Sequence, residues 1–420
     1  MAYDIAIVGA GASGLAAGIA AGRRLIETAG GRQATPPGRV LLLERMPRAG
    51  KKILVTGNGR CNLGNRHALE HPYHNKKFAT PALQRFDAGV SSVLQRFDAG
   101  VPPVLERFGM EACEAFFDSL GLAIQENDDG RLYPRSNMAA SVLNALRFGA
   151  ARAGCETKCD FPVTQIEPTP DGFIINKSIT ARRVIIAAGG CAAPAQGSDS
   201  SGFSLLRALG HRIVAPRPAL VQIKIKSLLL PMLKGLRAQA GITLTRDGQV
   251  LREAAGEVLF TQDGLSGIAA MEVSREAGPG CVAMLDLLPD YTEEKLTALL
   301  SRWQGCLSDY TPAQILAGLL PGRVAEALVK VCEDHSPAAL AKTCKRFTFE
   351  VTGTRSFEHA QVTAGGADVR AFDPRTMESR IVPGLFACGE ALDVDGGCGG
   401  FNLHWAWASG TSAGRSAASE

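Results

Sequence analysis

Short apolar runs alternate with glycine-rich turns along much of the chain, and the first of these runs is Ile5–Val8. It is long enough for one buried strand. Gly9, Gly11 and Gly14 follow in G-x-G-x-x-G spacing, and the next residues are small, as in a helix packed closely on a sheet. Such glycines permit a tight turn, admit a pyrophosphate to the backbone and let the helix touch the strand. The pattern predicts a dinucleotide site at a helix N-terminus; the alternative is a glycine-rich turn of an unrelated α/β protein.

A second predicted buried strand, Val40–Leu43, ends in Glu44. In dinucleotide-binding folds an acid at this position accepts hydrogen bonds from the adenosine ribose. The gap from the glycines exceeds the usual spacing of about 20 residues, and the Gly-, Pro- and Thr-rich stretch Thr28–Arg39 explains the excess as an inserted loop. The alternative for Glu44 is a solvated strand end. An acid rather than a base disfavours a 2′-phosphate at this site.

The segment Gly50–Asn62 is cationic and punctuated by glycines. Its Lys51, Lys52 and Arg60 can neutralise a pyrophosphate, and its Asn58 and Asn62 can orient a polar ring. Cys61 is a candidate redox residue, but no second thiol lies near it in the sequence. We therefore favour a packing role for Cys61.

The region from residue 83 to residue 190 begins with a near-perfect tandem repeat, residues 83–93 and 94–104. Two copies are too few for a solenoid, and we interpret them as a local duplication that lengthens a surface segment. We predict helices over Phe108–Gly121 and Ser136–Ala153 (capped by Ser136 or Asn137), strands over Phe161–Ile166, Gly172–Ile175 and Arg183–Gly190, and a turn or short strand at Arg131–Pro134.

The pattern changes after about residue 195. Apolar and polar residues alternate over Leu220–Lys226, which is the period of a half-buried strand. Further strands are expected over Ala240–Leu244 and Val258–Thr261, with Asp247-Gly248 as a hairpin turn. The stretch Thr292–Cys332 has helical periodicity, broken at Pro312 and Pro321. These patterns predict an inserted region with a β part and a helical part.

The last part of the chain returns to the character of the first. We expect a strand at Arg346–Val351 and a glycine-rich junction at Val362–Ala367. A buried strand follows over residues 381–390 and ends in a glycine and an acid, which suits a ligand hydroxyl. The glycine-rich stretch Asp395–Leu403 leads into a small-residue helix over Trp405–Arg415.

Composition and charge narrow the class of protein. The chain has 420 residues, so two or three domains are expected. Its net charge of +4 is too slight to indicate nucleic-acid binding by itself. Its eleven cysteines form no C-x-x-C pair, which disfavours a redox or zinc motif and suits a reducing, cytoplasmic setting. Signal-sequence features are lacking, and no apolar run approaches the 18 or so residues of a membrane span.

Together these motifs resemble a bacterial flavoprotein family. Its members are described as NAD(P)/FAD-dependent oxidoreductases or aminoacetone-oxidase-family FAD-binding enzymes, and they include flavin-dependent enone reductases of bile acids. The resemblance covers nearly the whole chain. Its most specific pieces are the residues 9–14, 51–62, 256–267, 363–366 and 389–403.

The resemblance implies an α/β fold with a Rossmann-like FAD-binding domain split in sequence, an inserted β-barrel-like domain and a small helical domain. The expected boundaries are 1–195 with 346–420, then 196–290 with about 335–345, then 291–334. The flavin is expected near Asn58–Asn62 and Gly399–Leu403, where the N-terminus of the last helix would stabilise negative charge on the reduced ring.

The residues expected to hold FAD come from the glycine turn, the cationic loop and the later strand ends. They are Gly9, Gly11, Ala12, Ser13, Gly14, Glu44, Arg45, Lys51, Lys52, Thr56, Gly57, Asn58, Arg60, Cys61, Asn62, Val163, Ala188, Gly189, Gly190, Gly389, Glu390, Gly399, Gly400, Phe401, Asn402 and Leu403. No metal site is expected.

The leading functional hypothesis is an FAD-dependent oxidoreductase that reduces a small organic substrate through flavin N5, with NAD(P)H as a transient electron donor. A flavin oxidase that uses oxygen remains open. So do an FAD-dependent tRNA-modifying enzyme, suggested by basic residues between 207 and 252, and a flavin-binding module without catalysis. Catalytic candidates by residue type are Tyr133, Arg131, His404 and Cys61, and the sequence does not choose among them. We expect a small-molecule substrate and no membrane partner, and the slight net charge disfavours a nucleic-acid partner.

Overall fold

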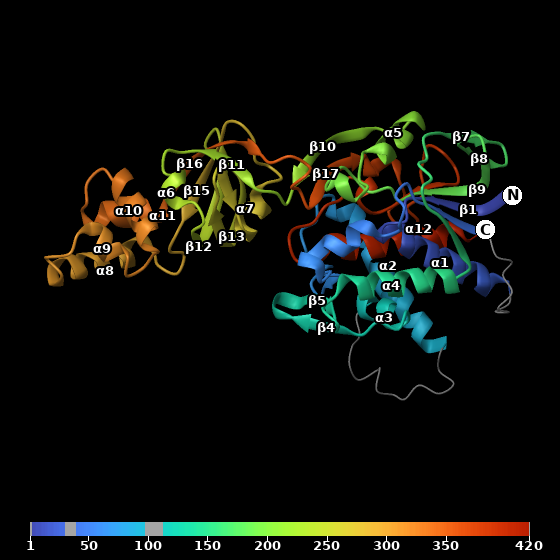
Figure 1. Cartoon of the computed structure of the whole chain (residues 1–420), viewed down its shortest axis with the longest axis horizontal. Helices are drawn as coiled ribbons and strands as arrows, with labels where there is room; N and C mark the ends of the chain where they lie inside the picture. Colours follow the sequence, from blue (N-terminus) through green and yellow to red (C-terminus); the bar gives the residue numbers. More distant parts are fainter. Residues whose placement is uncertain (1, 30–38, 97–111, 420) are drawn as a thin grey trace. The chain divides into compact units, whose positions relative to one another are not determined.

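The computed structural model describes residues 2–29, 39–96 and 112–419. The chain divides into two compact units, which are Met1–Arg217 with Val362–Glu420, and Pro218–Gln361. Figure 1 shows the elements of both units, coloured along the sequence. The first unit is therefore built from two distant stretches of chain, and the second is inserted between them.

The first unit is organised around a seven-stranded sheet of order β6-β2-β1-β9-β8-β7, with β18 paired to β9 off this path. Strands β6, β2, β1, β9 and β18 run parallel, whereas β7, β8 and β9 are antiparallel neighbours. Their bounds are β1 Ala2–Val8, β2 Val40–Leu43, β6 Cys155–Lys158, β7 Ile166–Thr169, β8 Gly172–Ile175, β9 Ile179–Ile186 and β18 Leu385–Ala387.

The central strands are the apolar runs of the sequence. Ile5–Val8 and Val40–Leu43 are buried throughout, as expected where a parallel sheet is covered on both faces. The backbone N–H of Ala187 donates to Val8 O (2.8 Å), so β9 and β1 end side by side. Because parallel strands end at one edge of the sheet, the loops after them converge there.

Two long helices, α1 (Ala12–Thr28) and α12 (Phe401–Ala417), pack against each other beside this sheet (Figure 1). The approach is close because α12 presents glycines. A Cβ at Gly410 would lie 2.3 Å from Ser13 O, and one at Gly414 would lie 2.1 Å from Ala17 O. Only glycine fits at such contacts, which explains the small residues in both helices.

Several shorter elements complete the first unit. Its remaining helices are α2 Lys76–Arg96, α3 Ala112–Asp118, α4 Ala139–Arg152 and α5 Ser201–Ala208, with 3₁₀ turns at Lys51–Gly59, Asp128–Gly130, Pro194–Gln196, Val369–Ala371 and Gly389–Ala391. A small antiparallel sheet has the order β3 (Gly64–Asn65), β5 (Arg131–Pro134), β4 (Ile124–Asn127), and β10 (Ile213–Ala219) pairs with β17 (Val362–Ala367).

Some sequence predictions need correction. Helix α4 begins later than predicted, with Met138 as N-cap and no capping side chain, so neither Ser136 nor Asn137 caps it. The strand predicted from Phe161 begins only at Ile166. Residues 30–38 of the inserted loop and 97–104 of the second repeat copy lie outside the described residues.

The second unit contains a closed barrel of order β11-β14-β13-β12-β15-β16. The strands are β11 Ile223–Lys226, β12 Arg237–Arg246, β13 Gln249–Phe260, β14 Gly264–Ser266, β15 Cys281–Asp286 and β16 Phe347–Thr354. Alternate residues of β12, namely Ala240, Ile242 and Leu244, are buried, as the period of two requires. Asp247 and Gly248 join β12 to β13 with φ angles of 50° and 76°, which confirms the predicted hairpin turn.

The helices of the second unit follow the predicted breaks. They are α6 Leu230–Leu233, α7 Ile268–Val273, α8 Glu293–Cys306, α9 Pro312–Leu316, α10 Gly322–Val331 and α11 Pro337–Lys345. Pro312 opens α9, where a missing N–H costs nothing, and Thr311 with Gln314 forms a capping box there. Side chains of α8–α11 share one apolar cluster with the barrel interior.

The α/β fold class, with a Rossmann-like sheet and a closed barrel, is confirmed. The division into three domains remains a prediction. Among the described helices, none has the length and hydropathy needed to cross a membrane.

Candidate functional site

The turn after β1 leaves room for a ligand at one of its three glycines. Gly9 has a φ of +100°, and a Cβ there would lie 2.5 Å from Ala187 O. A Cβ at Gly14 would lie 1.9 Å from Gly9 O, whereas one at Gly11 would meet no protein atom within 4 Å. The fold itself therefore requires Gly9 and Gly14, but protein packing does not require Gly11. Open space beside the N-terminus of α1 fits the approach of a phosphate.

Glu44 lies at the end of β2, next to this turn, and is 8% exposed. Its carboxylate oxygens accept the backbone N–H groups of Ala10 (3.0 Å) and Met46 (2.9 Å). Two charge-assisted hydrogen bonds thus fix the carboxylate, which keeps further lone pairs for ligand hydroxyls. The neighbouring Arg45 is ion-paired to Asp199.

The segment that contains Val163 lies along this strand end. The backbone N–H of Phe161 donates to Glu44 O (2.9 Å), and that of Asp160 donates to Met46 O (3.2 Å). Val163 itself is 7% exposed. Backbone rather than side-chain contacts therefore bring this part of the chain to the site.

The ends of β9 and β18 meet at the same edge of the sheet. A Cβ at Gly190 would lie 2.4 Å from Thr363 Oγ1, and one at Gly389 would lie 2.6 Å from Ser13 Oγ. Gly189 has a φ of +73°. Gly190, after β9, thus lies close to the start of β17, and Gly389, after β18, lies close to the start of α1.

Glu390 links this edge to the cationic loop. Its carboxylate accepts Lys52 Nζ (3.0 Å) and the backbone N–H of Thr363 (2.6 Å). Lys51 Nζ donates to Ala195 O (2.9 Å). Lys52 and Glu390, 338 residues apart, are thus brought together, and both remain about one quarter exposed.

The remainder of the cationic loop has an irregular backbone. Gly57, Asn58, Gly59 and Cys61 all have positive φ, and Thr56 Oγ1 donates to Ile53 O (2.7 Å). The Arg60 guanidinium lies over the Tyr133 ring, 4.8 Å from its centroid.

Asn62 joins the cationic loop to the start of α12. With its amide nitrogen turned toward the carbonyls, Asn62 donates to Gly64 O (3.0 Å) and Leu132 O (3.1 Å) and accepts Gly400 N–H (3.1 Å). The two loops expected beside a flavin are therefore neighbours.

The glycine-rich loop before α12 is held by side chains of Asn402 and Asn65. Asn402 accepts Gly396 N–H (2.8 Å) and donates back to Gly396 O (2.9 Å). Asn65 donates to Gly399 O (2.9 Å). Gly400 has a φ of +94°, and a Cβ at this position would lie 2.3 Å from Gly64 O. Phe401 and Leu403 are partly buried in the same apolar core.

Two of the catalytic candidates are sealed from water. His404 is 3% exposed, and burial lowers its pKa to about 4, so the ring is neutral at pH 7. Its Nδ1 has no hydrogen-bond partner. Burial raises the pKa of the Cys61 thiol to about 11, so this thiol is protonated and a poor nucleophile. Tyr133 is buried under Arg60, and Arg131 is paired with Asp129 (3.7 Å).

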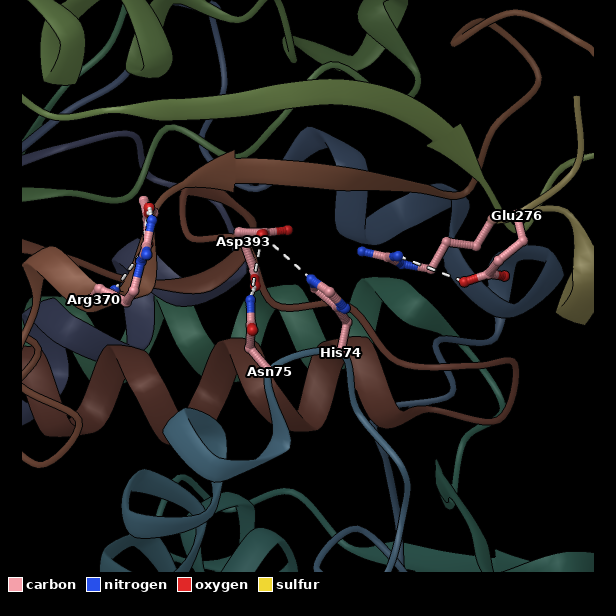
Figure 2. A network of polar contacts seen from close by, with 7 residues as sticks. His74, Asn75, Glu276, Arg370 and Asp393 are labelled. Carbon is pink, nitrogen blue, oxygen red and sulfur yellow. Dashed lines mark hydrogen bonds and ion pairs between the residues drawn. The ribbon is translucent and has the colours of Figure 1, made fainter. Parts of the chain in front are cut away.

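A group that the sequence reasoning missed lies between α12 and the start of α2. Figure 2 shows His74 and Asn75 directed at Asp393, which is buried. His74 Nε2 lies 3.3 Å from Asp393 Oδ2, and Asn75 Nδ2 donates to Asp393 O (2.6 Å). His74 and Asp393 are 319 residues apart, so no local pattern could pair them. No group of His, Cys, Asp and Glu suited to a metal occurs in the described ranges.

The family model described as "HI0933-like protein Rossmann domain" matches residues 90–416. The chain belongs to this family. A curated relative, "3-dehydro-bile acid delta(4,6)-reductase" of Clostridium scindens, is 34% identical over 99% of this chain and 98% of its own length. "Ribosomal RNA dihydrouridine synthase" of Escherichia coli is 28% identical over 97% of this chain and 96% of its own.

Among solved structures, the 3-ketosteroid delta1-dehydrogenase from Sterolibacterium denitrificans is similar with a TM-score of 0.46 at 13% identity, over 99% of each chain. The family match and the curated relatives confirm the resemblance drawn from the sequence and the enzyme class, a flavin-dependent oxidoreductase.

Proposed function

We propose that this HI0933-like protein is an FAD-dependent reductase of carbon–carbon double bonds conjugated to a carbonyl group, acting on a small apolar substrate. The observation that supports FAD as the cofactor is the open space at Gly11, in a turn whose other two glycines are packed against backbone. The reaction class rests on chemistry common to two relatives.

The two curated relatives share one type of substrate bond. A delta(4,6)-reductase of a 3-dehydro bile acid and a dihydrouridine synthase both have names that describe saturation of a double bond conjugated to a carbonyl. Such a bond accepts a hydride at its β carbon because the carbonyl takes up the negative charge. When bound, FAD supplies the hydride through its N5.

The residues of the site fit FAD part by part. Gly9, Gly11 and the first N–H groups of α1 would hold the pyrophosphate, and Glu44 would accept the ribose hydroxyls. Glu390, fixed by Lys52, would accept a hydroxyl of the ribityl chain. The start of α12, which follows Gly400, would stabilise negative charge on the reduced ring.

The charge of the inserted unit favours a small molecule over RNA. Residues 218–361 hold 15 Lys and Arg against 16 Asp and Glu. Proteins that bind RNA phosphates concentrate positive charge on the binding surface. Of the basic residues between 207 and 252 that the sequence singled out, those from Lys224 onward belong to this unit, where acids balance them. We propose a reduced nicotinamide as electron donor, by the usual chemistry of flavin reductases.

The test uses the purified full-length protein. Its absorbance spectrum is recorded, the released cofactor is identified by chromatography, and NADH or NADPH is added anaerobically. A 3-oxo-4,6-diene steroid acid, a simple cyclic enone and deproteinised ribosomal RNA are then offered in turn. Reoxidation of the flavin by an enone, with the saturated ketone as product, is expected.

Other outcomes would contradict the proposal. Dihydrouridine turnover (its formation from uridine or its loss from the RNA) without enone reduction would establish the RNA-directed alternative. Rapid reoxidation by air with no organic product would indicate an oxidase. Absence of bound FAD after reconstitution would remove the basis of the proposal.

A further inference from the structure

The segment His71–Asn75 is bonded along its length to the loop that leads into α12. The backbone N–H of His74 donates to Asp395 O (2.9 Å), and Tyr73 Oη donates to Phe401 O (3.1 Å). Asn75 Nδ2 donates to Asp393 O (2.6 Å). The segment is therefore tied by hydrogen bonds to the loop that continues into the start of α12, which we propose lies beside the flavin.

The two histidines of this segment have different hydrogen-bond partners. His71 Nε2 accepts the Gly397 N–H (2.8 Å), and the ring stacks on Phe401 with centroids 3.6 Å apart. This accepted hydrogen bond requires an unprotonated Nε2. His74 instead presents its Nε2 to the Asp393 carboxylate at 3.3 Å. Its Nδ1 has no hydrogen-bond partner within the described part of the chain, and the side chain is 36% exposed.

This arrangement suits proton transfer at His74. The Asp393 carboxylate accepts the Nε2 proton in both charge states of the ring, and so fixes Nδ1 as the nitrogen that takes up and releases a proton. Asp393 is held in turn by Asn75 (Figure 2). Partial exposure lets water restore the proton after each turnover, which the sealed His404 does not allow.

We propose that His74 is the general acid of the reduction and that Asp393 and Asn75 are its positioning residues. The inference rests on the proposed function. A hydride supplied by the reduced cofactor forms the new C–H bond at the β carbon, and the electron pair of the double bond moves onto the carbonyl as an enolate. The Nδ1 proton of His74 then forms the C–H bond at the α carbon. A reduced nicotinamide restores the two electrons, and water restores the proton.

The test compares His74→Ala with wild type in both half-reactions. Removing a general acid costs about 10²–10⁴-fold in rate, so enone-dependent reoxidation of the flavin is expected to fall at least 100-fold. FAD content, melting temperature and anaerobic reduction by NAD(P)H are expected to stay unchanged. Added imidazole is expected to restore part of the lost rate in His74→Ala.

Two further variants sharpen the test. Asp393→Asn keeps the size of the side chain but no longer selects the His74 tautomer, so it is expected to slow reoxidation less than His74→Ala does, without rescue by imidazole. His335→Ala is the control, because His335 is an exposed histidine of the other unit whose Nε2 faces Val329 O (3.3 Å). It is expected to behave as wild type.

Three results would overturn the inference. His74→Ala could reoxidise within threefold of wild type, or lose its rate together with FAD and without imidazole rescue. Tyr133→Phe could show the 100-fold loss instead. If wild type binds and reduces its flavin but reduces no enone, the proposed function fails first, and this inference fails with it.

Discussion

Substituting Gly11 and Gly14 separately by alanine should separate what the fold needs from what the cofactor needs. At Gly14 the new Cβ would lie 1.9 Å from Gly9 O, so the first turn of α1 must move by more than 1 Å to reach ordinary contact. Overpacking of this kind costs about 1–3 kcal/mol. We therefore expect Gly14→Ala to destabilise the apoprotein.

At Gly11 we expect alanine to leave the stability of the apoprotein almost unchanged and to weaken FAD binding. Its φ of −82° and ψ of −159° suit any residue, and the added Cβ meets no protein atom within 4 Å. Replacing glycine by alanine lowers the entropy of the unfolded chain, which stabilises the folded protein by about 0.4–1 kcal/mol. Alanine is a poorer N-cap than glycine, which destabilises the folded protein by a similar amount. The stability of the apoprotein should therefore change by less than about 1 kcal/mol, whereas the Cβ occupies the space left for a phosphate.

The assay measures both quantities on the same proteins. Melting of the apoproteins reports stability, at roughly 2–4 °C per kcal/mol for domains of this order of size. Titration with FAD, followed by quenching of its fluorescence, reports affinity. Gly11→Ala should lose at least about tenfold in affinity, or about 1.4 kcal/mol, and Gly11→Val should abolish binding. Wild-type affinity in Gly11→Ala, or melting as low as that of Gly14→Ala, would refute the reasoning.

Three other predictions follow from packing and burial. Gly410→Ala should destabilise the protein by about 1–3 kcal/mol, since its Cβ would lie 2.3 Å from Ser13 O, whereas Gly305→Ala, which meets nothing within 4 Å, should not; comparable melting temperatures would contradict this. Burial lowers the pKa of His404 to about 4. Between pH 4 and about pH 6.5 this histidine is therefore protonated in the unfolded chain but neutral in the folded protein. Stability should therefore be complete above pH 6.5 and fall by up to about 3 kcal/mol as the pH drops to 4, and a His404→Gln variant with an unchanged slope in thermal melts would argue against it. Iodoacetamide at pH 8 should alkylate exposed Cys306 and spare Cys61, whose thiol pKa is raised to about 11; mass spectrometry of digests decides.

The elements that the sequence predicted well are those whose pattern is local. The apolar runs at Ile5–Val8 and Val40–Leu43 are central strands, because a parallel sheet covered on both faces buries every residue of such strands. The hairpin at Asp247-Gly248 followed from turn chemistry alone. In contrast, β6 (Cys155–Lys158) is largely exposed and polar, and its role as the parallel edge partner of β2 has no local signature.

The candidate site also combines features that follow from local sequence with features that depend on long-range contacts. The spacing of the glycine turn predicted Gly11 as a cofactor contact without a structure, and this role stays a prediction. The pairing of His74 with Asp393 depends on a crossing of chain segments 319 residues apart. His404, adjacent to the motif in sequence, proved to be sealed in the core, because a helix turns successive side chains to different faces.

The split of the first unit has a consequence for how the protein is made. Trp407 Nε1 donates to Leu63 O (2.7 Å) across 344 residues of chain, and α1 finds its glycine-lined partner only in α12. At about 5–20 residues per second, a ribosome needs roughly 20–70 s to travel from Leu63 to Trp407. During that time α1 can pack on β1, β2 and α4, but the side of α1 that contacts α12 has no partner. The first unit can therefore be completed only after α12 has been synthesised.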